Sequence, residues 1–279
     1  STPLYSSAAS DVYKRQDYAR KFGISSKMPH QLSMSLGAGE TNLIKLTSAY
    51  AMLVNGGKKI TPTFIDKIQD RNGRTIFRQD TRPCLECRSA DQSLNKVPVI
   101  PDYREQIVDR ASAYQMVRML EGVVKRGTGR RIASLNKPLA GKTGTTNKNF
   151  DTWFIGFSPD LAFGVYVGFD NPKTLGRRDT GSNVAAPIFK RFMKIALKGM
   201  PEVPFRAPPG ILHVRINTET GSLARPGDKN IITEVFKPGS VPTGASRIVD
   251  GGYAAGWMSR KQGKSWKRSL DIRGIKGIY

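Results

Sequence analysis

The chain has 279 residues, of which 38% are hydrophobic, and a formal net charge of +23 at pH 7. This length and apolar content suffice to bury a sizeable core in one or two domains, which excludes a largely disordered chain. So positive a charge raises the question of a nucleic-acid partner, but the basic residues are spread along the chain and no nucleic-acid motif accompanies them. We therefore predict no nucleic-acid partner and interpret the charge as that of a solvated basic surface.

The N-terminal part predicts two helices after an extension without a function. Residues 1–16 are expected to be a spurious or disordered extension. A short amphipathic helix follows from residue 17 and ends at Gly23, and a firmer helix is predicted from about Thr41 to Val54, before the stop signal Gly56-Gly57. The apolar residues that repeat with the helical period, and that we expect in the core, are Leu43, Leu46, Tyr50, Leu53 and Val54.

A hairpin and a surface insertion are predicted next. Residues 62–77 alternate around Asn72-Gly73, which is typical of a tight hairpin turn. Residues 79–106 are polar and Pro-rich and are interpreted as a surface insertion that carries the two cysteines, Cys84 and Cys87. A zinc site would need four ligands, and there is no second cysteine pair, so neither a metal nor another cofactor is expected. In an oxidising compartment the two thiols favour a disulfide, with free thiols as the alternative.

Two further helices and a β-rich extension are also expected. Asp109 or Ser112 caps a helix that ends at Gly127, and residues 181–183 are expected to cap another, near the end of the domain. The apolar stripe of the first of these helices is Ala113, Met116, Val117, Leu120 and Val123, and that of the second is Val184, Ile188, Phe189, Phe192 and Leu197. Residues 201–250 form a Pro/Gly-rich extension with short strands at 211–216 and 231–236, and 251–279 a basic tail of low apolar content, predicted to be disordered.

The chemistry concentrates on residues 142–146, which we expect to form a strand with an open edge. A hairpin follows, with strands at 152–157 and 161–169 that are rich in aromatic and β-branched residues. Thr143 and Thr145 are two residues apart and point to the same side, so their hydroxyls and the Lys142 ammonium would suit a carboxylate, while free strand N–H groups pair with an extended peptide. The alternative is a Thr-rich edge strand with a solvated lysine.

A phosphate-binding loop is excluded for the same residues. Gly141-Lys142-Thr143 matches the end of that motif, but the motif needs a glycine five positions earlier and a helix after the lysine. Position 136 is Asn136, and a hairpin follows.

Several motifs in order resemble the transpeptidase domain of bifunctional class A penicillin-binding proteins. Lys-Thr-Gly on a strand is one motif shared by penicillin-binding proteins and class A β-lactamases. The resemblance covers roughly residues 17 to 240 and rests on the strings at 140–147, 151–156, 36–41, 49–51, 55–57 and 122–129. It implies an α+β fold in which helices flank an antiparallel sheet, with residues 17–200 as a partial transpeptidase domain.

The resemblance also implies roles for four residues. Lys142 would place positive charge beside the substrate carboxylate, and the Thr143 and Thr145 hydroxyls would bind that carboxylate. Gly144 would let the peptide approach, and the backbone N–H of Thr145 would be one oxyanion-hole donor. The implied reaction is cross-linking of D-Ala-D-Ala stem peptides of peptidoglycan through a serine acyl-enzyme, with β-lactams as inhibitors.

The nucleophile of the family is expected to lie outside this chain. The Ser-x-x-Lys and Ser-x-Asn motifs normally precede residue 36, and only Ser93 and Ser134 begin such patterns here, in the wrong order. We interpret both as coincidental and expect the chain to be an inactive C-terminal part whose N-terminal part and membrane anchor are missing. Its parent would also carry a glycosyltransferase and lie on the periplasmic face of the bacterial inner membrane. The alternatives are a DD-carboxypeptidase or β-lactamase-like hydrolase, and a non-catalytic envelope-binding module.

Overall fold

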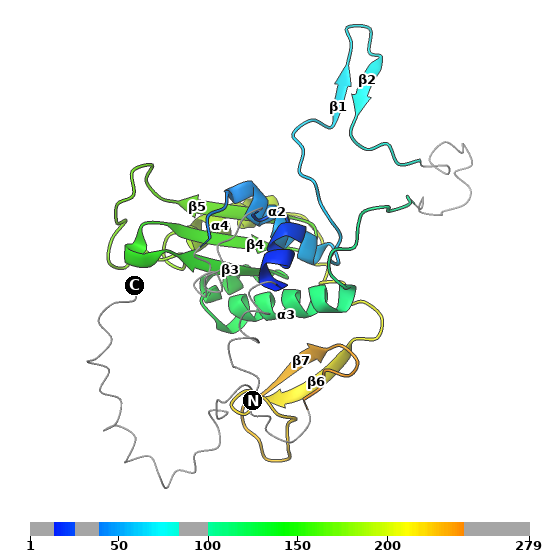
Figure 1. Ribbon diagram of the computed structural model, residues 1–279. Coiled ribbons are helices and arrows are strands. Elements are labelled where there is room, and N and C mark those ends of the chain that lie inside the picture. Colours follow the sequence, from blue (N-terminus) through cyan, green and yellow to red (C-terminus); the bar gives the residue numbers. More distant parts are fainter. Residues whose placement is uncertain (1–13, 26–38, 84–99, 243–279) are drawn as a thin grey trace, which may run out of the picture. The chain divides into compact units, whose positions relative to one another are not determined.

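The computed structural model describes residues 14–25, 39–83 and 100–242 (Figure 1). The chain divides into two compact units, with the boundary between Pro209 and Gly210. The predicted Cys84–Cys87 disulfide and the predicted disordered tail, 251–279, lie outside the described residues. Residues 14–21 are helical, so the first helix begins earlier than the predicted residue 17, inside the predicted extension.

The first unit is built on a three-stranded antiparallel sheet. It consists of β3 (Ala140–Thr145), β4 (Thr152–Phe157) and β5 (Ala162–Val167), in the order β3-β4-β5. The hairpin predicted from the aromatic and β-branched runs is confirmed, and its turn is closed by the Ser158 N–H, which donates to the Leu161 carbonyl at 2.8 Å. Gly156 lies where a Cβ would come within 2.8 Å of the Ala140 carbonyl oxygen and of the Phe189 ring, so a glycine is needed for strand and helix to approach this closely.

Helices pack on both faces of this sheet. Helix α2 (Leu43–Val54) lies on one face, where the Tyr50 ring is 6.4 Å from that of Phe157. Helix α4 (Ala185–Ala196) and the 3-10 helix η3 (Arg130–Leu135) lie on the other, where the Phe154 and Phe189 rings are 4.7 Å apart. The buried core of that second face includes Val124, Ile132, Leu139, Phe154, Val165, Phe189 and Met193. The predicted α+β fold with helices flanking an antiparallel sheet is thus confirmed.

The helices themselves are confirmed, but part of each predicted core stripe is wrong. In α2, capped by Asn42, the buried residues are Ala49 and Met52, and Leu43 is exposed. In α3 (Arg110–Arg126) the predicted cap Asp109 accepts from the Ser112 N–H, but Met116 is exposed. An apolar stripe read from the helical period is wider than the face that a helix buries against its neighbours, so its outer members remain in contact with solvent.

In α4 the difference from prediction is larger. Ile188 and Phe192 are 46% and 39% exposed, and the buried residues are Ala185, Ala186, Phe189 and Met193. Two alanines at the start let the helix lie close to the sheet, which turns the bulkier Ile188 outward. Residues 181–183 are not the cap either, because the helix begins after Val184, which makes no side-chain cap bond.

The remaining elements are two hairpins and a short 3-10 helix. Strands β1 (Lys67–Gln69) and β2 (Thr75–Arg78) form the predicted one, with Gly73 at a φ of +80° in its turn. In the second unit, β6 (Leu212–Asn217) pairs antiparallel with β7 (Ile231–Phe236), as expected. A single-turn 3-10 helix, η4 (Asn147–Asn149), joins β3 to β4. Across the described segments, no helix is long and apolar enough to cross a membrane, and no cluster of His, Cys, Asp and Glu suits a metal ion.

Candidate functional site

Strand β3 lies at the edge of its sheet. Within the described residues it pairs with β4 on one side and with no strand on the other. The Thr146 N–H donates to the Asp151 carbonyl at 3.0 Å, toward β4. Because successive backbone groups of a strand alternate in direction, the N–H and C=O groups of Thr143 and Thr145 point to the opposite edge. Thr143 and Thr145 therefore direct their backbone N–H groups to the edge that has no strand partner in the described residues.

This edge is accessible along four of the six residues of β3. Figure 1 shows α3 beside β3, and the two elements are in contact. Ala140 and Gly141, at the start of the strand, are buried, whereas Lys142 and Thr145 are exposed and Thr143 and Gly144 are half-buried. The accessible part of the edge thus coincides with the four residues that the sequence singled out.

The ammonium and the two hydroxyls leave the strand on different faces. Residues opposite one another in an antiparallel pair share a face, and Lys142 is paired with Ile155, on the face that α2 covers. Thr143 is paired with Phe154, on the α4 face, and Thr145 lies two residues further along on that same face. The Lys142 Nζ nevertheless stays near the edge, because it donates to the Thr143 carbonyl at 2.9 Å. The ammonium is therefore turned toward the edge, whereas the two hydroxyls lie on the opposite face of the sheet from the Lys142 side chain.

Both threonine hydroxyls have partners outside the strand. The Thr143 and Thr128 hydroxyl oxygens are 2.8 Å apart, and Thr145 Oγ1 accepts from the Gly181 N–H at 3.0 Å. The Ser182 hydroxyl donates to the Thr128 carbonyl at 2.8 Å. Sequence reasoning missed these contacts, because it took residues 181–183 for a helix cap. The signal was the Gly-Ser-Asn string itself, whose polar groups bind other segments.

A second polar group lies where β3 turns into β4. The Tyr166 hydroxyl donates to Asp151 Oδ1 at 2.8 Å, and Asp151 Oδ2 is 3.2 Å from the Thr146 hydroxyl. The Tyr166 ring also packs on Trp153, with the ring centroids 4.6 Å apart. The hydrogen bond to Asp151 raises the pKa of Tyr166 above its ordinary value, because it stabilises the neutral phenol beside a carboxylate. This arrangement was not foreseen from the sequence, and it fixes the turn that follows the strand.

The two Ser-x-x-Lys patterns do not form a catalytic pair in the described part of the chain. Ser93 lies outside the described residues. Ser134 is exposed in η3, and its hydroxyl is 3.4 Å from the Arg131 carbonyl. Lys137 points elsewhere, because its Nζ is 3.0 Å from a carboxylate oxygen of Glu202. A nucleophilic serine needs a base within hydrogen-bonding reach, and no such contact is made at Ser134.

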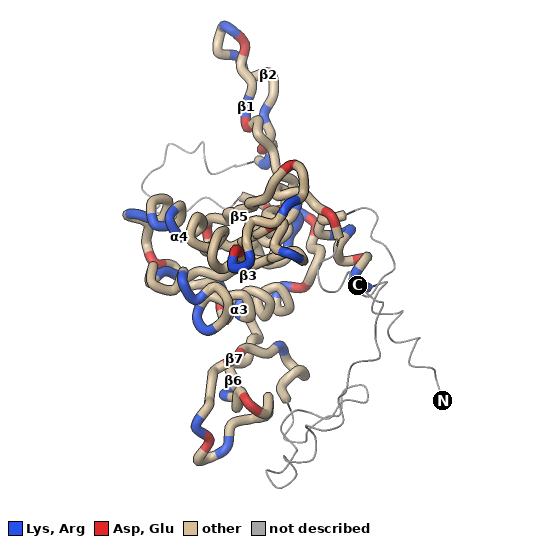
Figure 2. Tube along the Cα trace, turned by 90° about the vertical axis from the view of Figure 1, so that its left-hand side faces the viewer, with Lys and Arg blue, Asp and Glu red and all other residues tan. Residues whose placement is uncertain are grey.

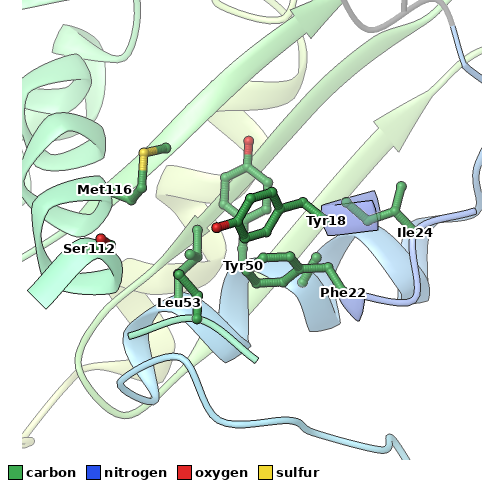
Figure 3. Close-up of a pocket in the computed structure, with 9 residues that line it drawn as sticks. Tyr18, Phe22, Ile24, Tyr50, Leu53, Ser112 and Met116 are labelled. Atoms are coloured by element: carbon green, nitrogen blue, oxygen red, sulfur yellow. The ribbon is translucent and has the colours of Figure 1, made fainter. Parts of the chain in front are cut away.

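An apolar cavity of about 340 Å³ lies elsewhere in the first unit (Figure 3). The helix at residues 14–21, α2 and the start of α3 contribute its walls, which include Phe22, Leu53 and Met116. Burial raises the pKa of the Tyr50 hydroxyl, which lies in the same wall. The two tyrosines of the cavity, Tyr18 and Tyr50, are the titratable side chains of a lining that includes no residue of β3.

Comparison with known proteins decides the family. Residues 13–194 match the family described as "Penicillin binding protein transpeptidase domain". The chain belongs to this family. Among curated relatives of this transpeptidase, it is 43% identical over 227 residues to penicillin-binding protein 1A of Rickettsia conorii and 35% identical over 267 residues to that of Pseudomonas aeruginosa. These alignments cover 81% and 85% of this chain but only 28% and 32% of the two relatives, so the chain spans about a third of their length.

Solved structures agree with the assignment to the transpeptidase family. Penicillin-binding protein 1A from Haemophilus influenzae is similar, with a TM-score of 0.69 and 29% identity, over 83% of this chain and 37% of that protein. The structure of the PonA1 protein of Mycobacterium tuberculosis in complex with penicillin V is also similar, with a TM-score of 0.54 and 26% identity. The match covers 69% of this chain and 51% of the PonA1 chain. The resemblance inferred from the sequence motifs is therefore confirmed.

Proposed function

We propose that this chain is the C-terminal part of the transpeptidase domain of a bifunctional peptidoglycan synthase. Its parent would cross-link D-Ala-D-Ala stem peptides, carry a glycosyltransferase as well, and act at the periplasmic face of the inner membrane through an anchor outside this chain. The observation that carries the proposal is the accessible edge of β3, which has no strand partner in the described residues and bears Lys142, Thr143 and Thr145 beside outward backbone N–H groups. The family and the relatives named penicillin-binding protein 1A support it.

The edge suits the free end of a peptide. An extended peptide adds to a strand edge through main-chain hydrogen bonds, and the outward groups of Thr143 and Thr145 provide them. The terminal carboxylate would accept from the two hydroxyls and lie near the Lys142 ammonium, which is a charge-assisted arrangement. Gly144, between Thr143 and Thr145, is half-buried. A Cβ at this position would lie 3.0 Å from Trp153 Cβ, so a glycine fits here without a close contact with that side chain.

The chemistry would be acyl transfer through a serine that the rest of the domain supplies. The serine oxygen attacks the carbonyl carbon between the two D-alanines, the amide bond breaks, and the terminal D-alanine leaves with the proton on its amine. An amine of a neighbouring stem then attacks the ester, forms the new amide and returns the proton to the serine. The Thr145 N–H, which points to the open edge, would donate to the oxyanion in both steps, and one such donor is worth about 3 kcal/mol.

The same site would take β-lactams, which mimic the substrate. The relative PonA1 has been solved in complex with penicillin V, and it shares the fold of this chain. Ser134, exposed and without a base, does not suit the role of nucleophile. We therefore propose that the 279-residue chain alone is inactive and forms no covalent adduct with penicillin.

A chimera tests the proposal. Residues 17–240 of this chain would replace the aligned segment of Rickettsia conorii penicillin-binding protein 1A, which leaves the relative's own N-terminal part in place. We expect fluorescent penicillin to acylate the chimera. Lys142→Ala should slow acylation about 10- to 100-fold, since a hydrogen bond to a charged group is worth about 1.5–3 kcal/mol. The matched control is Lys198→Ala, which removes an exposed lysine beyond the end of α4.

Three outcomes would contradict the proposal. An unchanged acylation rate in Lys142→Ala would remove the lysine from the site. Labelling of the unmodified 279-residue chain at Ser93 or Ser134 would show that the nucleophile lies in this chain. Release of free D-alanine by the chimera, with no cross-linked product from stem peptides, would favour the hydrolase alternative.

A further inference from the structure

Three segments that are distant in sequence meet at the two threonines of β3. The first is the loop at the end of α3, which carries Thr128, and the second is β3 itself. The third is the turn before α4, where the Gly181 N–H donates to Thr145 Oγ1 at 3.0 Å and the Ser182 hydroxyl donates to the Thr128 carbonyl at 2.8 Å. The Thr128 and Thr143 hydroxyl oxygens are 2.8 Å apart.

These contacts assign the acceptor role of the Thr145 hydroxyl, whereas either hydroxyl of the Thr128–Thr143 pair can be the donor. A hydroxyl has one hydrogen and two lone pairs, and a carboxylate only accepts. Thr145 Oγ1 already accepts from a backbone N–H, which leaves its hydrogen for a ligand. The Thr143 hydroxyl has its hydrogen available for a carboxylate only if the Thr128 hydroxyl donates to the Thr143 oxygen.

We propose that Thr128 is a positioning residue that orients the Thr143 hydroxyl as a donor to the substrate carboxylate. This inference rests on the proposed function and names a residue outside the Lys-Thr-Gly string. Thr128 touches no substrate group itself and acts through Thr143.

The surroundings of Thr128 hold it in place for this role. The N–H groups of Gly127 and Gly129 both donate to the Val123 carbonyl, which ties the loop to the end of α3. Ser182 fixes the loop from the α4 side. Gly181 lies so close to β3 that a Cβ would come within 2.5 Å of the carbonyl oxygens of Gly144 and Trp153. The backbone of Thr128 is thus held on two sides, by the end of α3 and by Ser182, which is the preorganisation that a hydrogen-bond donor needs.

The matched pair Thr128→Val and Thr128→Ser tests the role in the chimera described above. Valine keeps the shape and removes the hydroxyl, whereas serine keeps the hydroxyl. We expect Thr128→Val to weaken the pre-covalent binding of a penicillin with a free carboxylate about 3- to 10-fold, as expected for one neutral hydrogen bond. The rate of the following acylation step should stay within about twofold. Thr128→Ser should resemble the parent, and thermal unfolding of all variants would check that they fold.

A penicillin methyl ester separates positioning from a structural role, because its ester group carries no negative charge. Thr128→Val should leave the binding of the ester unchanged. In a Thr143→Val background, Thr128→Val should cause no further loss in the binding of the penicillin that carries a free carboxylate. Equal losses for acid and ester would overturn the positioning role while leaving the proposed function intact. A parent chimera that penicillin does not acylate at all would overturn the proposed function, and the role of Thr128 with it.

Discussion

The Asp151–Tyr166 pair shows how single hydrogen bonds set the properties of side chains beside the β3 edge. The Tyr166 hydroxyl donates to Asp151 Oδ1 at 2.8 Å, although the ring is 42% exposed. The bond favours the neutral phenol, and the nearby carboxylate opposes the phenolate, so the pKa of Tyr166 lies above its ordinary value. The bond therefore contributes to stability below pH ~10, and the contribution is lost as the pH rises through the raised pKa.

We predict that Asp151→Asn returns the pKa of Tyr166 toward its ordinary value, because the negative charge beside the phenol is removed. The measurement is the tyrosine ¹³Cζ chemical shift between about pH 9 and 12. The chain has nine tyrosines, so the Tyr166 signal would be assigned by its loss in Tyr166→Phe. Asp160→Asn, which changes an exposed carboxylate in the β4–β5 turn, is the control. An identical Tyr166 titration in Asp151→Asn and the parent would contradict the prediction.

At the same residue scale, the sequence predicted what lies on one strand and missed what joins distant segments. Lys142, Thr143 and Thr145 are adjacent in a motif, and strand alternation gives their directions. The Thr128–Thr143 and Gly181–Thr145 contacts span loops whose paths no local pattern specifies. Local propensity assigned residues 181–183 to a cap, because Gly, Ser and Asn favour that position.

At the scale of elements, residues 58–83 and 100–106 form the described part of an excursion that is closed at its base. The Lys59 N–H donates to the Glu105 carbonyl at 2.8 Å, and Lys58 Nζ is 2.7 Å from an Asp102 carboxylate oxygen. The Arg104 guanidinium, and after it the Lys58 ammonium, hold the pKa of Asp102 well below its ordinary range. Every residue of β1 and β2 is exposed, so this hairpin buries no apolar side chain of the core.

We predict that residues 62–100 can be replaced by a Gly/Ser loop of about four residues with little loss of stability. The closing contacts at Lys58, Lys59 and Glu105 remain in the shortened chain. Any exposed ion pair that is lost with residues 62–100 contributes only about 0–1 kcal/mol to stability. The melting temperature should stay within about 4 °C of that of the parent chain. The control Phe154→Ala, a fully buried ring, should lower the free energy of unfolding by about 3–5 kcal/mol. A comparable loss on deleting the excursion would show that it belongs to the core.

Pattern reasoning succeeded for elements whose sequence carries a strong local signal. The aromatic and β-branched runs predicted β4 and β5, and Asn72-Gly73 predicted the turn between β1 and β2. It failed for the burial of Ile188 and Phe192, because the period gives the direction of an apolar face but not the packing distance. That distance depends on Ala185 and Ala186, whose small size becomes informative only once the sheet is in place.

At the scale of the whole molecule, the net charge of +23 is the dominant property. Figure 2 shows basic residues on many elements of the described chain, with acidic residues among them, rather than on one strip. A dispersed positive charge attracts any polyanion by releasing its counterions, but it does not read the order of bases. Attraction to nucleic acid in vitro would therefore be expected without any role for it as a partner.

We predict that the purified 279-residue chain binds two DNA duplexes of unrelated sequence with equal affinity, because only phosphates are contacted. Polyglutamate should compete with both duplexes in proportion to its charge. The affinity for each should fall by at least about one order of magnitude between roughly 50 and 200 mM salt. Fluorescence anisotropy of labelled duplexes measures all three quantities. A preference above about tenfold for one duplex, or binding that survives the higher salt, would point to specific base contacts and restore the nucleic-acid hypothesis that the sequence argued against.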